Sequence, residues 1–211
     1  MPSAITCEVV SSHSAGIRED EFHLMVQLFA NHSLAKVLTD HNLAEDLSED
    51  ARSVLKKYEK QGGGVIAAAW VASALLKAGF SYILEPVVRL NLGNLNERML
   101  GPYDLAVVIK GKYLVLEIKL FKKKKKNHVK KQRMKFYEEI IKTYEEVIDY
   151  IKLAKKCGVY IGLLIIDISG ASINLMTPDY IAVVRATGGW GDEKKVVEEV
   201  MELARRLGLP A

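Results

Sequence analysis

The stretch PYDLAVVIKGKYLVLEIK, from Pro102 to Lys119, decides how this chain folds. Both halves are rich in leucine, valine and isoleucine, which are common in buried strands. Lys110-Gly111 between them suits a two-residue turn, whose positive φ angles glycine tolerates. The stretch therefore predicts two antiparallel strands joined as a hairpin.

The turn also fixes which residues face one another. Ile109 faces Lys112 next to the turn, so Asp104 lies directly across from Glu117 further along the two arms. Because side chains alternate between faces, Asp104, Glu117 and Lys119 share one face of the hairpin. The opposite face is uniformly apolar and is predicted to be core; it consists of Leu105, Val107, Ile109, Leu114, Leu116 and Ile118.

Two carboxylates set opposite each other repel, and each raises the pKa of the other unless a cation lies between them. Mg²⁺ prefers oxygen ligands and retains several waters, so two carboxylates and the oxygens of a substrate phosphate suit it. Asp104 and Glu117 are therefore candidate metal ligands, and Lys119 is a candidate for holding the attacking water or stabilising the transition state. A plainer interpretation stays open, in which Glu117 and Lys119 form a solvated ion pair on an unrelated interaction domain.

The residues around the hairpin resemble the motif of the PD-(D/E)xK nuclease superfamily, which has the restriction-endonuclease-like fold. Pro102-Tyr103-Asp104 precedes the first strand, and Glu117-Ile118-Lys119 lies on the second. The resemblance covers residues 65–184 and lies in the order of the predicted elements, which is helix, three strands, helix and strand. One further strand and one helix complete the order. It implies that Asp104, Glu117 and the backbone carbonyl of Ile118 hold Mg²⁺ or Mn²⁺, and that Lys119 assists hydrolysis.

The sequence departs from the family's pattern at a further acid. Many members, the archaeal Holliday junction resolvases among them, carry a glutamate in the helix before the first strand, whereas the predicted helix at residues 65–77 contains no acid. Glu59 and Gln61 lie just upstream of it, and Glu85 lies in the predicted strand 81–90. Glu85 ranks first as a substitute, because a strand beside the hairpin would direct it to the same site. Its alternative role is that of a glutamate on the rim.

A basic segment follows the hairpin directly. Residues 119–135 contain ten lysines or arginines and no acid, whereas the rest of the chain has 20 basic against 26 acidic residues. Asn127 is the predicted N-cap of a long helix whose N-terminus would cradle a phosphate of nucleic acid. The predicted nucleic-acid-binding residues are Lys122, Lys123, Lys124, Lys125, Lys126, Lys130, Lys131, Gln132 and Arg133. A solvated basic loop is the alternative.

The remaining patterns place these features in an α/β domain. The apolar run at residues 158–167 is typical of a central strand covered on both faces, a further strand is predicted at 180–184, and an amphipathic helix at 193–207 closes the chain. The predicted fold is a restriction-endonuclease-like mixed β-sheet flanked by helices. Residues 61–211 form this domain, and residues 1–60, with helices at 17–30 and 43–58, form an N-terminal helical extension.

Cysteines and apolar runs indicate the environment of the protein. Cys7 and Cys157 are isolated and belong to no cluster with histidines, which argues against a zinc site and fits a reducing interior. No signal peptide is evident and no apolar run reaches the length of a membrane span, so a soluble, cytoplasmic protein without a membrane partner is expected. The chain has a high content of lysine, glutamate, isoleucine and valine and few glutamines, a composition that is typical of thermophilic proteins.

The resemblance implies Mg²⁺-dependent endonucleolytic hydrolysis of DNA phosphodiester bonds. The small size and the basic segment beside the site are most similar to a structure-selective, junction-resolving enzyme of the Holliday junction resolvase kind. Such enzymes act as homodimers because branched DNA needs two cuts. The alternative is a DNA-binding protein that retains the nuclease fold but cleaves weakly or not at all, which the absence of an acid from the helix favours.

Overall fold

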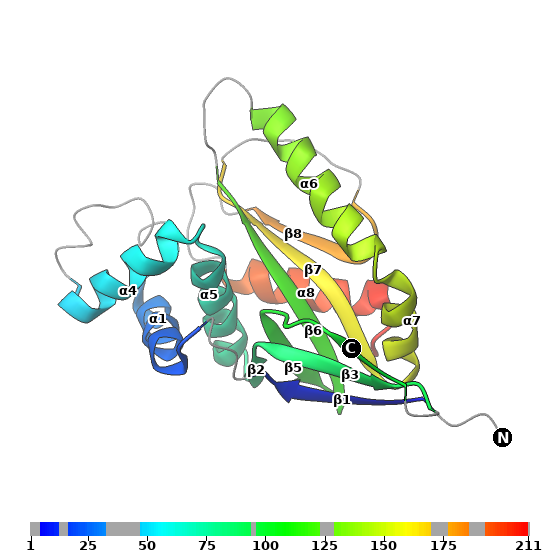
Figure 1. The fold of residues 1–211 in the computed structure, drawn as a ribbon. Helices are drawn as coiled ribbons and strands as arrows, with labels where there is room; N and C mark the ends of the chain where they lie inside the picture. Colours follow the sequence, from blue (N-terminus) through cyan, green and yellow to red (C-terminus); the bar gives the residue numbers. More distant parts are fainter. Residues whose placement is uncertain are drawn as a thin grey trace.

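A computed structural model describes residues 5–12, 17–32, 47–93, 96–122, 129–169, 177–185 and 193–210 (Figure 1). In these ranges the chain forms eight strands in two sheets and six helices, a mixed α/β architecture. The elements in chain order are β1 (Thr6–Ser11), α1 (Glu19–Asn31), α4 (Glu49–Lys60), α5 (Gly64–Lys77), β2 (Tyr82–Leu84), β3 (Pro86–Asn91), β4 (Glu97–Leu100), β5 (Leu105–Ile109), β6 (Lys112–Phe121), α6 (Val129–Glu145), α7 (Ile148–Lys156), β7 (Val159–Asp167), β8 (Ile181–Arg185) and α8 (Glu193–Leu207).

The main sheet has the order β2-β5-β6-β7-β8. The first three strands are antiparallel, and β6, β7 and β8 run parallel, so the sheet is mixed. The predicted hairpin is confirmed in its register, because Ile109 pairs with Lys112 next to the turn and the pairing continues outward to Leu105 and Leu116. Both turn residues have the positive φ angles that a two-residue turn of this kind needs, 48° at Lys110 and 75° at Gly111.

Apolar side chains cover both faces of this sheet. One face packs against α1, α4, α5 and α8, and it contains the six hairpin residues predicted to be core, each at most 3% exposed. The other face packs against α6, α7 and the smaller sheet. All nine residues of β7 are buried, as its continuous apolar run predicts.

The predicted strand at residues 81–90 divides into two strands of different sheets. Glu85 separates β2, which pairs with β5, from β3, which belongs to a smaller antiparallel sheet of order β1-β3-β4. The φ angle of Glu85 is 46°, and this left-handed conformation turns the chain out of one sheet and into the other. Neither β1 nor β4 is among the predicted strands. β4 is an edge strand whose first three residues are exposed, so it carries no apolar alternation.

The predicted long helix after the basic segment is divided as well. Its described part forms α6 and α7, with a turn at Glu146 and Val147. The N–H of Val147 bonds to the carbonyl of Tyr144, three residues back, which tightens the last turn and ends α6. The β-branched Thr143, Val147 and Ile148 around this point lower the local helix propensity.

The first 60 residues supply more than helices. In their described part, α1 and α4 pack against α5, but β1 pairs along its whole length with β3.

The two cysteines differ from the expectation that each is isolated. Cys7 of β1 and Cys157 after α7 are joined as a disulfide, with their Cα atoms 5.9 Å apart, so the two cysteines are not isolated in space.

Within the described ranges, no helix combines the length and the apolarity that a membrane span requires.

Candidate active site

Asp104 lies at the entrance to the hairpin, one residue before β5 begins. Its backbone N–H donates to the carbonyl of Leu116 at 3.1 Å, and its Oδ2 accepts a hydrogen bond from the backbone N–H of Ile118 at 2.5 Å. These two bonds tie Asp104 to the β6 residues on either side of Glu117, just beyond the last pair of the hairpin, Leu105 and Leu116. β6 runs on past this point to Phe121, whereas the chain on the β5 side turns away at Tyr103.

The environment of Asp104 opposes its ionisation. Burial raises the pKa of this carboxyl from 3.8 to about 7, and the charges of Glu117 and Glu85 add to the rise. The Ile118 N–H and the charge of Lys119 act in the opposite direction but do not outweigh them. A carboxyl held in this way is typical of sites that bind a cation or transfer a proton.

Glu117 and Lys119 form an ion pair through Glu117 Oε1 and Lys119 Nζ. Their side chains remain partly open to solvent, at 23% and 42% exposure respectively. Burial acts to lower the pKa of Lys119, but the charge and hydrogen bond of Glu117 outweigh it and raise that pKa above its ordinary value. Lys119 is therefore a cation at neutral pH.

The carbonyl of Ile118 can be placed from the direction of its own N–H. In an extended strand the N–H and C=O of one residue point toward the same neighbouring strand. Because the Ile118 N–H is directed at Asp104, its carbonyl is directed to the same edge of β6. Beyond Glu117 that edge is not paired with β5, whose register ends at Leu105 and Leu116.

Glu85 lies beside Asp104, although it belongs to a different strand segment. The N–H of Glu85 donates to the carbonyl of Asp104 at 3.2 Å, and its carboxylate is close enough to raise the pKa of Asp104. Of the other two predicted substitutes, Glu59 lies 3.8 Å from Lys122 in an ion pair, and Gln61 lines the same hollow as Asp104. In the described part of the chain, no three His, Cys, Asp or Glu side chains gather as a metal cluster.

Three adjoining hollows surround these residues. The Asp104 hollow, about 300 Å³, is lined by Gln61, Gly62, Gly64, Asp104, Ile118 and Lys119 among others. The Tyr103 hollow, about 490 Å³, is lined by Tyr103, Glu117, Lys119, Phe136, Glu139 and Leu163 among others. The Lys122 hollow, about 600 Å³, is lined by Glu59, Lys122, Gln132, Lys135, Phe136 and Glu139 among others.

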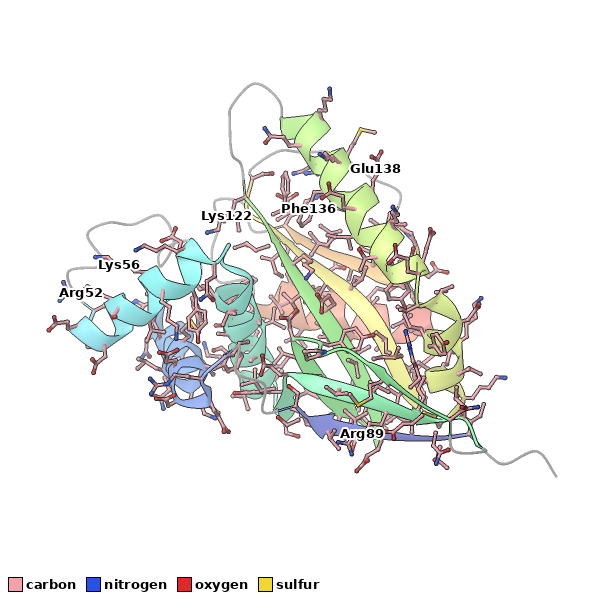
Figure 2. The ribbon with its side chains drawn as sticks, viewed as in Figure 1. Arg52, Lys56, Arg89, Lys122, Phe136 and Glu138 are labelled. Carbon is pink, nitrogen blue, oxygen red and sulfur yellow. A yellow bond between two sulfur atoms is a disulfide. The ribbon has the colours of Figure 1, made fainter. Side chains whose placement is uncertain are left out.

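Phe136 of α6 borders all three hollows, and Lys119 borders the first two. Figure 2 shows Phe136 between α6 and the end of β6, with Lys122 on the side of β6 that faces α4 and α5. Asp104 and Glu117 thus open into neighbouring hollows with Lys119 between them. The sequence analysis had no signal for the role of Phe136, because its spacing is that of an ordinary helix core.

The glycines before α5 allow that helix to begin against β6. Gly63 has a φ angle of 78°, and a Cβ atom there would lie 2.9 Å from Leu120 Cδ2 and 3.0 Å from Lys122 Nζ. Both the backbone conformation and the close approach therefore need glycine. The first turn of α5 has no acidic residue and its N-cap makes no side-chain hydrogen bond, so the positive end of the helix lies beside the Asp104 hollow.

The predicted basic surface is described only in part. Residues 123–128, which include Lys123, Lys124, Lys125, Lys126 and the expected N-cap Asn127, and the side chain of Lys130 lie outside the described residues. Lys131 is exposed on α6, and Lys122 and Gln132 line the Lys122 hollow.

Arg133 differs from the expectation of a surface phosphate contact. Its side chain is 1% exposed, pairs with Asp167 at 2.5 Å and donates to the hydroxyl of Ser169 at 2.6 Å. Its guanidinium also lies 5.5 Å from the ring centroid of Phe121. Arg133 therefore anchors α6 to the ends of β6 and β7. The sequence contains a partial signal, the acid at the end of the β7 run, but nothing that pairs it with Arg133.

The comparisons with known proteins do not assign a family. No family model and no curated protein matches this sequence. A solved structure that matches is the crystal structure of protein VC1899 from Vibrio cholerae, with a TM-score of 0.37 and 13% sequence identity. The match covers 76% of this chain and 49% of VC1899, so the chain spans about half the length of that protein.

Proposed function

We propose that this protein is a Mg²⁺-dependent endonuclease that hydrolyses phosphodiester bonds of DNA, with its site at Asp104, Glu117 and Lys119. One observation carries the proposal. A carboxyl with a pKa raised to about 7 lies near a second carboxylate and a cationic lysine at the open edge of a strand, where two hollows of the surface adjoin. Such a concentration of like charge is costly for stability and is explained by a cation that binds there.

The donor set fits Mg²⁺ or Mn²⁺. Asp104 and Glu117 supply carboxylates, the carbonyl of Ile118 is directed to the same edge, and Glu85 adds negative charge beside Asp104. Hard cations of this kind need only one or two carboxylates when water and substrate phosphate complete the coordination. The bound ion would neutralise charge on the phosphate and lower the pKa of a water.

The protein's own groups would bind and orient the substrate. Lys119 stays protonated at neutral pH, so it acts as a donor to a phosphate oxygen rather than as a base. The positive end of α5 and Lys122 lie on the other side of the Asp104 hollow and attract the same phosphate. Lys131 on α6 extends the cationic surface along the DNA backbone.

The order of elements supports a restriction-endonuclease-like fold for the central part of the chain. α5 precedes the antiparallel strands β2, β5 and β6, and α6 and α7 then lead to β7, which is parallel to β6. This is the order of helix, three strands, helix and strand that the sequence resemblance implies, and β8 and α8 close it. The smaller sheet is an addition to that order.

A cleavage assay tests the proposal. Supercoiled, linear and four-way-junction DNA are incubated with the protein in Mg²⁺, in Mn²⁺ and in EDTA, beside Glu117→Gln and Lys119→Met. We expect metal-dependent cleavage that each substitution reduces by at least about a hundredfold. Lys152→Met is the matched control, since Lys152 forms an exposed ion pair with Asp149 on α7. Cleavage that survives Glu117→Gln or Lys119→Met would show that the site lies elsewhere.

One observation favours the alternative of a binding protein that retains the fold without turnover. Glu117 is paired internally with Lys119 through Oε1, so the lysine competes with a metal for the carboxylate. DNA binding that weakens steeply with salt, without cleavage in either metal, would support this alternative. A preference for four-way junctions and a dimer in size-exclusion chromatography would support a junction-resolving homodimer.

A further inference from the structure

The Tyr103 hollow has a different character from the phosphate-binding side of the site. Its walls are mostly apolar or aromatic, with Phe136 and Ile140 from α6, Leu163 from β7 and the ring of Tyr103. At about 490 Å³ it falls within the roughly 300–1,000 Å³ of pockets that take small organic groups. It shares Glu117 and Lys119 with the candidate active site, so whatever fills it lies directly beside the reacting phosphate.

The charges around this hollow favour an occupant other than a phosphate. Glu117, Glu139 and Glu146 line it, and Lys119 is the only cationic residue among its described lining residues. The Lys122 hollow on the other side of Phe136 has Lys122 and Lys135 among its lining residues and suits the DNA backbone better. Carboxylates beside an aromatic wall accept hydrogen bonds from amino groups, as they do with the exocyclic amine of cytosine.

We infer that the Tyr103 hollow receives one unstacked nucleobase with an exocyclic amino group, from the DNA strand whose phosphate lies at Asp104 and Glu117. The inference rests on the proposed function and gives it a substrate class. Phe136 provides a face for stacking, and the glutamates accept from the amino group of adenine or cytosine. A base can enter only after it leaves the helical stack, so the preferred substrate has an unpaired nucleotide next to the scissile bond.

Filling the hollow tests this inference. Thr143 and Glu146 are exposed residues on its rim, so Thr143→Trp, and Glu146→Trp as a second variant, place an indole at the hollow without disturbing the core. Glu138→Trp is the matched control, because Glu138 is an exposed residue of α6 that does not line the hollow (Figure 2). Circular dichroism and thermal unfolding establish that each variant is folded.

Binding is measured by fluorescence anisotropy in Ca²⁺, with single-stranded oligomers of roughly twelve nucleotides. The probes are oligo-dA, oligo-dC, oligo-dT, an abasic oligomer of the same length, and a fully paired duplex. We expect Thr143→Trp to weaken binding of oligo-dA roughly tenfold and to leave the abasic oligomer unchanged within about twofold. The original protein should prefer oligo-dA and oligo-dC to oligo-dT, and single strands to the duplex.

The outcomes separate this inference from the proposed function. Equal effects of Thr143→Trp on oligo-dA and on the abasic oligomer would overturn the base pocket, whether or not the protein cleaves DNA. A selective effect without cleavage in Mg²⁺ would support the pocket and count against the nuclease. If none of the oligomers binds, the base pocket is overturned, and the cleavage assay decides the proposed function. An effect of Glu138→Trp as large as that of Thr143→Trp would also overturn the pocket.

Discussion

The backbone N–H of Ile118 donates to Oδ2 of Asp104 and ties the first carboxylate of the candidate site to the residue between Glu117 and Lys119. This bond favours the ionised form of Asp104, yet burial and the charge of Glu117 outweigh it. The site is therefore organised by the backbone but left with more negative charge than its surroundings compensate.

The first prediction concerns pH. The pKa of Asp104 is raised from 3.8 to about 7, so between these values the folded protein keeps a proton that the unfolded chain has released. The free energy of unfolding therefore falls as pH rises through this window, by up to a few kcal/mol at about 1.4 kcal/mol per pKa unit. Asp104→Asn, which resembles the protonated form, should raise the melting temperature more at about pH 8 than at about pH 5, because only part of the window between the two pKa values has been crossed at pH 5. Equal shifts at both pH values would contradict this account.

The second prediction separates binding of metal from catalysis. Lys119→Met removes a cation that competes for Glu117, so Mn²⁺ should bind the variant at least about tenfold more tightly while cleavage is lost. Glu117→Gln should weaken binding of the same ion. Isothermal titration calorimetry measures both, with Lys152→Met as the control for loss of a surface lysine. Weaker binding to Lys119→Met would mean that Lys119 holds Glu117 in place for the metal.

The third prediction uses two residues with the same unusual backbone. Glu85 and Lys110 both have positive φ angles, 46° and 48°, which cost an L residue about 1 kcal/mol relative to glycine. Glu85→Gly and Lys110→Gly should therefore each leave stability unchanged or slightly raised in urea unfolding. Only Glu85→Gly should reduce metal binding and cleavage. Full activity in Glu85→Gly would show that Glu85 is not part of the site and serves only in the turn between the two sheets.

The hairpin could be predicted because its determinants are local. Lys110-Gly111 sets the turn, and the period of two along the arms then sets the pairing from Ile109 and Lys112 to Leu105 and Leu116 without reference to the rest of the chain. The continuous apolar run of β7 is a local signal of the same kind. The hairpin and β7 are therefore the elements of this molecule that the sequence describes best, and the candidate site at the end of the hairpin stays a prediction.

The features that the sequence analysis missed depend on partners far away in the chain. Arg133 and Asp167 are 34 positions apart, and Cys7 and Cys157 are separated by 150. An arginine in a basic segment, or an isolated cysteine, can occupy several environments in a folded protein. Only the packing of α6 and α7 against the strands determines which one it occupies. The division of strand 81–90 likewise depends on the smaller sheet, whose edge strand β4 carries little apolar pattern.

The fourth prediction distinguishes an anchor from a DNA contact on the same helix. Arg133→Met leaves Asp167 as a buried charge without its ion-pair partner, so the free energy of unfolding should fall by about 3–5 kcal/mol in urea. Lys131→Met, two residues earlier and exposed, should change stability by less than about 0.5 kcal/mol.

Measurements of DNA binding at several salt concentrations should rank the two variants in the reverse order, with the larger effect from Lys131→Met. Loss of Lys131 should reduce the salt dependence of binding by about one released ion, and loss of Arg133 should leave that slope unchanged in protein that is still folded. Asp167→Leu combined with Arg133→Met should recover much of the lost stability, because a buried ion pair can be replaced by apolar side chains of similar volume. A salt slope that falls in Arg133→Met would mean that the guanidinium leaves Asp167 to contact phosphate.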